Sequence, residues 1–218
     1  MTNYILDVAT ISPLSKNKPR QAIILCHGYG GDGKDISSLA INWQRFLPDA
    51  IFLCPNAPEV CSINPQGYQW FDATLEKEEE ILEKSLIAEE KLNIFLDQVF
   101  NNLQIETTNL ALVGFSQGCM IAIQVGLKKK EKINCLIGYS GKVINQKHLS
   151  DKIKSKPKIF LMHGVNDTIV SPTHLLEAKE YLVKHGLKIK TKLFKDCEHR
   201  IPVEGISLGL GFLKKNLL

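Results

Sequence analysis

Long apolar runs are missing from this sequence: no stretch approaches the roughly 18 apolar residues of a membrane-spanning helix. The segment Met1–Asp7 contains no basic side chain and its last residue interrupts its only apolar run, so we expect no signal peptide and no stable membrane insertion. The six cysteines form no Cys-x-x-Cys pair. We expect them to be reduced and buried in a cytoplasmic protein, with a Cys54–Cys61 disulfide as the alternative.

A large excess of one charge is missing as well. The sequence has 27 Lys and Arg against 23 Asp and Glu, which is a formal net charge of +4. The lysines fall mainly in expected helix ends and loops, while acidic side chains gather at 76–80. This distribution indicates a solvated surface rather than a basic stripe for phosphates, so we expect no nucleic-acid partner.

Short apolar runs alternate with longer amphipathic segments along the chain. Strands are expected at 4–9, 22–26, 50–54, 110–113, 134–139, 158–162 and 189–194, and helices at 35–46, 79–101, 117–129, 172–185 and 203–216. This alternation predicts an α/β fold, with a mostly parallel central sheet and helices on both faces. At 218 residues, without a repeat or an interdomain linker, the chain suits one domain over 1–218.

The most informative motif lies at 110–119, which reads Leu-Ala-Leu-Val-Gly-Phe-Ser-Gln-Gly-Cys. An apolar strand runs into Gly-x-Ser-x-Gly and then into a helix, the pattern of the nucleophile elbow of α/β-hydrolases. Gly114 and Gly118 would let strand and helix approach around an exposed Ser116 hydroxyl. A glycine-rich turn with a solvent-facing serine is the alternative, but the flanking apolar strand and helix favour a nucleophile.

A nucleophilic serine needs a base, and the base needs an acid that orients it. In α/β-hydrolases the order along the chain is serine, acid, histidine. His199 follows the last expected strand and is our candidate base, with a surface loop histidine as the alternative. Asp167 is the favoured acid, because Asp151 lies in a lysine-rich loop and Asp196 is too close to the base in sequence. We interpret His163, at a strand end, as a packing residue.

The oxyanion that forms during acyl transfer needs two N–H donors. The residue after the nucleophile, Gln117, is expected to supply one from its backbone. The glycine-rich loop His27–Gly33 follows an early strand, and the Tyr29 N–H is the natural second donor. A phosphate-binding loop is the competing interpretation, but the segment lacks Gly-x-Gly-x-x-Gly, and Lys34 is followed by Asp35 rather than Ser or Thr.

A long connection at 55–74 carries the aromatic residues Tyr68, Trp70 and Phe71. Loops of this length inside a domain are usually functional or mobile. Since large aromatic side chains are costly to expose, we expect them to cover either the edge of the core or a substrate pocket.

With these motifs the chain resembles the phospholipase/carboxylesterase family, the small α/β-hydrolases that include acyl-protein thioesterases and lysophospholipases. The matching segments are 27–30 (His-Gly-Tyr-Gly), 55–58 (Pro-Asn-Ala-Pro), 70–72 (Trp-Phe-Asp), 114–118 (Gly-Phe-Ser-Gln-Gly), 163–164 (His-Gly) with Asp167, and His199. Two positions depart from the pattern: Cys119 stands where a further glycine is common, and Glu198 stands where glycine usually precedes the histidine. Both bear on catalytic efficiency, through packing at the elbow and the pose of the histidine.

The resemblance implies Ser116 as nucleophile, Asp167 as orienting acid and His199 as base. It also implies the two backbone donors named above, and a substrate wall that includes Trp70 and Phe71, for which plain core residues are the alternative.

The activity implied by the resemblance is hydrolysis of carboxylic esters or thioesters of short to medium acyl chains through an acyl-enzyme, with no metal or other cofactor. The substrate would be a small molecule or an acylated carrier, and a weak homodimer is possible within the family. No insertion after the elbow is long enough to form a large cap domain, so we expect an open site. The alternatives are a dienelactone-hydrolase-like enzyme or a peptidase on the same fold, or a binding protein without catalysis.

Overall fold

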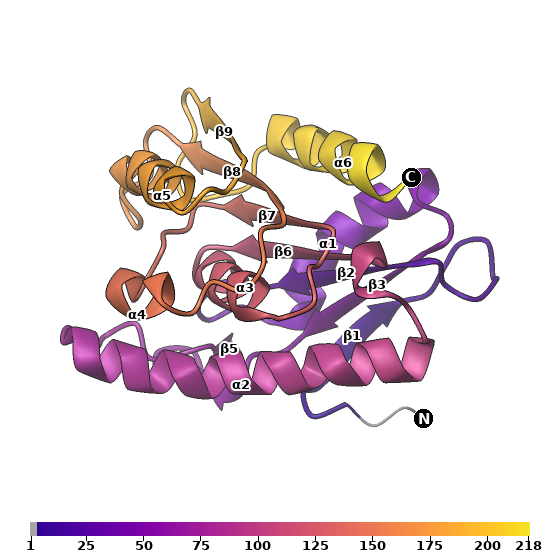
Figure 1. Ribbon diagram of the computed structural model, residues 1–218, viewed down its shortest axis with the longest axis horizontal. Helices are drawn as coiled ribbons and strands as arrows, with labels where there is room; N and C mark the ends of the chain where they lie inside the picture. The colour runs from indigo at the N-terminus through magenta and orange to yellow at the C-terminus, as the bar shows by residue number, and fades with distance from the viewer. Residues whose placement is uncertain (1–3) are drawn as a thin grey trace.

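A seven-stranded sheet forms the centre of the computed structural model, which describes residues 4–218 (Figure 1). The sheet order is β1-β3-β2-β6-β7-β8-β9, and only β1 runs antiparallel to its neighbour. The strands are β1 Val8–Ile11, β2 Gln21–Cys26, β3 Ala50–Pro55, β6 Leu110–Phe115, β7 Cys135–Tyr139, β8 Lys158–Gly164 and β9 Ile189–Phe194. The predicted mostly parallel α/β sheet is confirmed.

Helices cover both faces of this sheet, as the alternating pattern predicted (Figure 1). They are α1 Gly33–Trp43, α2 Glu78–Leu103, α3 Gln117–Lys128, α4 Gln146–Ser150, α5 Thr173–Lys184 and α6 Val203–Leu217, with 3₁₀ turns η1 Gln44–Phe46 and η2 Thr107–Asn109. Side chains of α2, α3 and α5 share one buried apolar cluster with the sheet, and those of α1 and α6 share the other. A small second sheet pairs β4 Glu59–Val60 with β5 Tyr68–Gln69.

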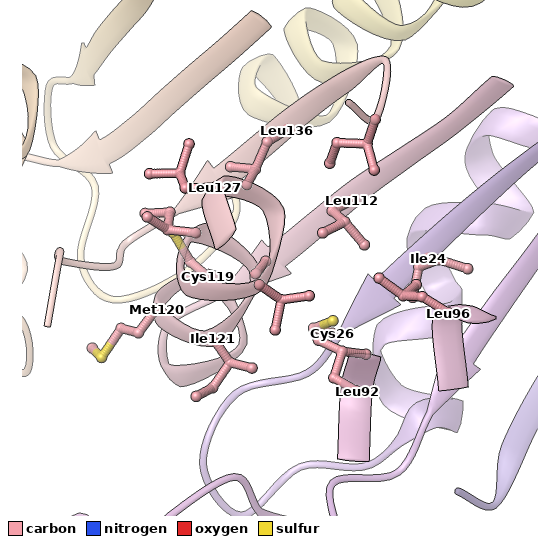
Figure 2. Packing of buried hydrophobic residues seen from close by; sticks show 14 of the residues in the cluster. Ile24, Cys26, Leu92, Leu96, Leu112, Cys119, Met120, Ile121, Leu127 and Leu136 are labelled. Atoms are coloured by element: carbon pink, nitrogen blue, oxygen red, sulfur yellow. The ribbon is translucent and has the colours of Figure 1, made fainter. Parts of the chain in front are cut away.

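The helix α3 is sandwiched between the sheet and α2, which explains why it is apolar on all sides. Figure 2 shows the packing, with labelled side chains from the strands (Ile24, Cys26, Leu112, Leu136), from α3 (Cys119, Met120, Ile121, Leu127) and from α2 (Leu92, Leu96). A helix buried in this way has little freedom to move, so its N-terminus is a rigid support for the residue that precedes it.

The first strand and three short elements differ from the sequence-based prediction. The first strand was expected at 4–9 but begins at Val8, because the residues before it pack on α2: the Tyr4 ring lies 5.1 Å from Phe95, and the Ile5 N–H donates to Gln98 Oε1 at 2.7 Å. The short helix α4 and the β4–β5 pair were missed, since segments this short carry almost no periodic signal. The cysteine prediction is confirmed: all six are buried free thiols, and the alternative Cys54–Cys61 disulfide does not form.

Within residues 4–218, no helix combines the length and apolarity that crossing a membrane requires.

Candidate active site

Ser116 occupies the sharp turn between β6 and α3 with φ +53° and ψ −118°, a backbone conformation that side-chain-bearing residues seldom adopt. The predicted glycines, Gly114 and Gly118, are required by close contact between the strand and the helix. A Cβ on Gly114 would lie 2.4 Å from the Gly118 carbonyl oxygen, and one on Gly118 would lie 2.2 Å from the Cys26 carbonyl oxygen. The strand and the helix therefore pack closely on either side of Ser116, which lies at the carboxyl edge of the sheet.

Three sequence-predicted side chains converge at this edge. His199 Nε2 lies 3.0 Å from Ser116 Oγ, and His199 Nδ1 lies 2.7 Å from Asp167 Oδ2. They come from three loops: the elbow, the β8–α5 connection and the β9–α6 connection. Because the carboxylate can only accept, the His199 Nδ1–H donates to it and Nε2 is left free to accept from the serine hydroxyl.

The two loops that carry the acid and the histidine are tied to each other by backbone contacts. The Asn166 N–H donates to the Cys197 carbonyl at 2.9 Å, and the Val165 N–H donates to the Phe194 carbonyl at 2.9 Å. A Cβ on Gly164 would lie 2.3 Å from the same Cys197 oxygen, so only glycine allows the loops to come this close. The spacing of His199 and the acid is thus set by the backbone.

The carboxylate of Asp167 is fully buried, yet its pKa is lowered. Its Oδ1 accepts from the backbone N–H groups of Ile169 at 2.9 Å and Val170 at 2.8 Å. Burial by itself raises the pKa of this carboxyl, but these donors and His199 outweigh burial and bring it below the ordinary value. The group therefore stays ionised beside the imidazole.

The glycine-rich loop after β2 lies against the elbow: a Cβ on Gly28 would be 3.3 Å from the Ser116 Cβ. The Gly30 N–H donates to the Tyr68 carbonyl at 2.9 Å, and the Gly31 N–H donates to the Gly28 carbonyl at 3.1 Å. In the part of the chain that the structure describes, the N–H groups of Tyr29 and Gln117 have no such acceptor. Their role as oxyanion donors stays a prediction.

The Gln117 side chain has a structural role that the sequence analysis missed. Its Oε1 accepts from the Trp70 N–H at 2.8 Å, and its Nε2 donates to the Phe71 carbonyl at 2.6 Å. The Trp70 indole N–H in turn donates to the His27 carbonyl at 3.0 Å. The elbow, the aromatic loop and the glycine-rich loop are thereby joined. The sequence carries no signal for this role, because the burial that makes the Gln117 amide need partners exists only in the folded chain.

Trp70 and Phe71 are themselves buried, 1% and 6% exposed, and belong to the apolar cluster shared with α2 and α3. Their backbones border the elbow through Gln117, which is one residue from the serine. Direct contact of either ring with substrate stays a prediction.

The two departures from the family pattern are accommodated differently. Cys119 is buried against Gly138 and Gly141, where a Cβ would lie 2.3 and 2.5 Å from its sulfur, so these two glycines make room for the larger side chain. Burial raises the pKa of the Cys119 thiol to about 12, which keeps it protonated. Glu198 precedes the histidine without disturbing its contacts to the serine and the acid.

A cavity of about 610 Å³ opens on the same edge, between the N-terminus of α2, the segment 142–148 and α5. It starts one residue after Gly141, whose Cβ would lie 3.1 Å from the Ser116 carbonyl oxygen. Its apolar lining comes from Ile81, Leu82, Val143 and Ile144, and charged side chains surround them. Ser116 itself does not line this space.

Among residues 4–218, no group of three or more His, Cys, Asp and Glu side chains is arranged to hold a metal ion.

Comparison with known proteins gives a consistent picture. The phospholipase/carboxylesterase family matches residues 8–217. Acyl-protein thioesterase 1 of Aspergillus fumigatus is 30% identical over 70% of this chain and 69% of its own, and the esterase YpfH of Escherichia coli is 23% identical over 92% and 85%. The crystal structure of esterase PE8 superposes with a TM-score of 0.92 at 31% identity, covering 97% of this chain and 99% of that one. The protein therefore belongs to the phospholipase/carboxylesterase family and has the α/β-hydrolase fold.

Proposed function

We propose that this protein is a serine hydrolase that cleaves carboxylic esters or thioesters of short to medium acyl chains through an acyl-enzyme. The observation that carries the proposal is the chain of contacts from Ser116 Oγ through His199 to Asp167, at 3.0 and 2.7 Å. A hydroxyl, a neutral imidazole and an ionised carboxylate in this order make up the machinery of nucleophilic acyl transfer.

In the first half-reaction, Ser116 Oγ attacks the carbonyl carbon while its proton passes to His199 Nε2. The buried carboxylate of Asp167 stabilises the imidazolium that results. The carbonyl oxygen becomes an oxyanion facing the Gln117 and Tyr29 N–H groups. Collapse of this intermediate breaks the bond to the alcohol or thiol, which leaves with the proton from His199.

The second half-reaction repeats these steps with water. His199 takes a proton from the water, whose oxygen attacks the acyl-enzyme carbonyl, and then returns that proton to Ser116 as the acid is released. Relatives named as an acyl-protein thioesterase and as esterases support both ester and thioester substrates. The apolar-lined cavity that begins next to Gly141 is assigned to bind a part of the substrate that lies away from the scissile bond.

The proposal is tested with p-nitrophenyl esters of two to sixteen carbons, measured for the wild type beside Ser116→Ala and His199→Ala. Each variant should lower kcat by roughly 10⁵–10⁶-fold, and Asp167→Asn by about 10⁴-fold because the wrong tautomer of the base is then favoured. The wild type should be fastest with short or medium chains.

Turnover within tenfold of the wild type in Ser116→Ala or His199→Ala would remove the assignment. A maximum at the longest chains would contradict the chain-length part alone and shift the substrate towards lysophospholipids or acylated proteins. A wild type no faster than Ser116→Ala at every length would favour a binding protein without catalysis.

A further inference from the structure

A second imidazole contacts the carboxylate of the active site. His163 lies near the end of β8, and its side chain is completely buried. Its Nε2 is 2.8 Å from the Val170 carbonyl oxygen and 3.1 Å from Asp167 Oδ2. Both neighbours are acceptors, so Nε2 must carry a proton.

The other ring nitrogen of His163 settles the charge of this imidazole. Nδ1 is buried and has no hydrogen-bond partner within residues 4–218, so a second proton there would be an unpaired buried charge. Burial accordingly lowers the pKa of His163, although its contacts with Val170 and Asp167 oppose the effect. The ring is a neutral Nε2–H donor.

Asp167 therefore faces donors at both of its oxygens. Its Oδ1 accepts two backbone N–H groups, and its Oδ2 faces His199 Nδ1 at 2.7 Å and His163 Nε2 at 3.1 Å. Two imidazoles thus share one carboxylate oxygen, but only His199 reaches Ser116.

We propose that His163 is a positioning residue of the hydrolytic reaction: its Nε2–H donates to the Val170 carbonyl at 2.8 Å, also lies 3.1 Å from Asp167 Oδ2, and weakens the attraction of that oxygen for the imidazolium of His199. The proposal rests on the proposed function. An oxygen that already faces one N–H group attracts a second donor less strongly, so removing the His163 N–H should strengthen the hydrogen bond between Asp167 and His199. A base that is neutral near the working pH is the form that can take the serine proton.

The surroundings leave Asp167 as the main electrostatic neighbour of both rings. In the described chain, a ring nitrogen of His163 and one of His199 each lie within 4 Å of the Asp167 carboxylate and of no other carboxylate. On its own loop His199 is flanked by Cys197, Glu198 and Arg200, and from β6 the uncharged Phe115 ring lies 4.9 Å from it.

Two variants separate a donor from a packing residue. His163→Phe keeps an aromatic ring and removes the Nε2–H, whereas His163→Gln places an amide N–H near the position of Nε2. In His163→Phe the acid limb of the kcat/KM profile should move to higher pH by about half a unit, so that activity well below the midpoint of that limb falls about threefold relative to the plateau. The profile of His163→Gln should coincide with that of the wild type.

A second readout needs no turnover. In the proton NMR spectrum of the resting protein, the Nδ1 proton between His199 and Asp167 should move downfield in His163→Phe and stay in place in His163→Gln. An unmoved acid limb or an unmoved proton in folded His163→Phe overturns the proposal.

If His163→Phe does not fold, His163→Asn takes its place, because the shorter amide ends near the position of Nδ1 and cannot reach Asp167. The same shifts are then expected, and the same null results overturn the proposal. Should Ser116→Ala show that hydrolysis occurs elsewhere, the proposed function fails, while the NMR comparison still decides whether His163 acts on Asp167.

Discussion

At the scale of single residues, the backbone of Ser116, the proposed nucleophile, is strained. Its φ of +53° and ψ of −118° lie outside the regions open to most residues, a cost of roughly 1–3 kcal/mol. The surrounding fold imposes this conformation: the Ser116 N–H donates to the Tyr139 carbonyl at 2.8 Å, and its own carbonyl accepts from Cys119 and Met120. In this strained conformation the Ser116 hydroxyl lies next to His199 Nε2.

Ser116→Gly should therefore be more stable than Ser116→Ala by about 1 kcal/mol, because glycine adopts this conformation without a Cβ clash and alanine does not. Both variants lack the Ser116 hydroxyl, so a difference between their stabilities reports the backbone alone. Urea unfolding followed by circular dichroism measures it. Equal stabilities, or a more stable Ser116→Ala, would show that no strain is stored at the elbow.

At the scale of elements, α2 and α3 are joined by two ion pairs of different burial. Lys128 Nζ lies 2.6 Å from Glu89 Oε2, and both side chains are largely buried, 14% and 5% exposed. Lys129 Nζ lies 2.6 Å from Asp97 Oδ1, where the carboxylate side chain is 61% exposed. Burial raises the pKa of Glu89 against the opposing effect of Lys128, so this carboxylate depends on its partner.

Lys128→Met should lower the free energy of unfolding by about 3 kcal/mol at pH 7, since it leaves the buried Glu89 without a partner. The double variant Lys128→Met with Glu89→Leu should recover most of that loss. Lys129→Met is the matched control and should cost no more than about 1 kcal/mol, because Asp97 can be solvated. Additive effects of Lys128→Met and Glu89→Leu in the double-mutant cycle would contradict this account.

At the scale of the whole molecule, two buried histidines couple folding to pH. Burial lowers the pKa of His27 and of His163 from the ordinary value of 6.5. His27 Nε2 accepts from the Ala57 N–H at 2.9 Å, while its Nδ1 lies 2.7 Å from the Gly28 carbonyl oxygen and donates to it, so the folded protein uses the neutral ring. The unfolded chain takes up protons at these positions at a higher pH than the folded protein does.

Stability should accordingly fall as the pH drops from 7.5 to 5, with the decline beginning near 6.5 and reaching at most about 1.4 kcal/mol per pH unit for each histidine. The lowered pKa of Asp167 acts in the same direction in a separate window, since its stabilisation is present above 3.8 and is lost as the pH falls further. Urea unfolding at several pH values measures the slope. His27→Gln keeps an acceptor for Ala57 but cannot titrate, so its slope should be smaller; a flat wild-type curve would refute the coupling.

Much of the architecture was readable from the sequence because it depends on local patterns. Continuous apolar runs marked the buried parallel strands, and the boundaries of β9 agree with the prediction. Gly-x-Ser-x-Gly between a strand and a helix located Ser116, and the order of elements located Asp167 and His199, since the carboxyl ends of parallel strands meet at one edge of a sheet.

The contacts that complete the site were decided by tertiary structure alone. His163 and Gln117 could be seen in the sequence, but no periodicity or spacing indicates that one shares an oxygen of Asp167 and the other holds the loop around Trp70. These hydrogen bonds join side chains to groups on separate loops, and buried polar atoms choose their partners only when packing has brought those loops together. The sequence determined the candidate nucleophile and its candidate partners, and the folded chain determined what surrounds the carboxylate.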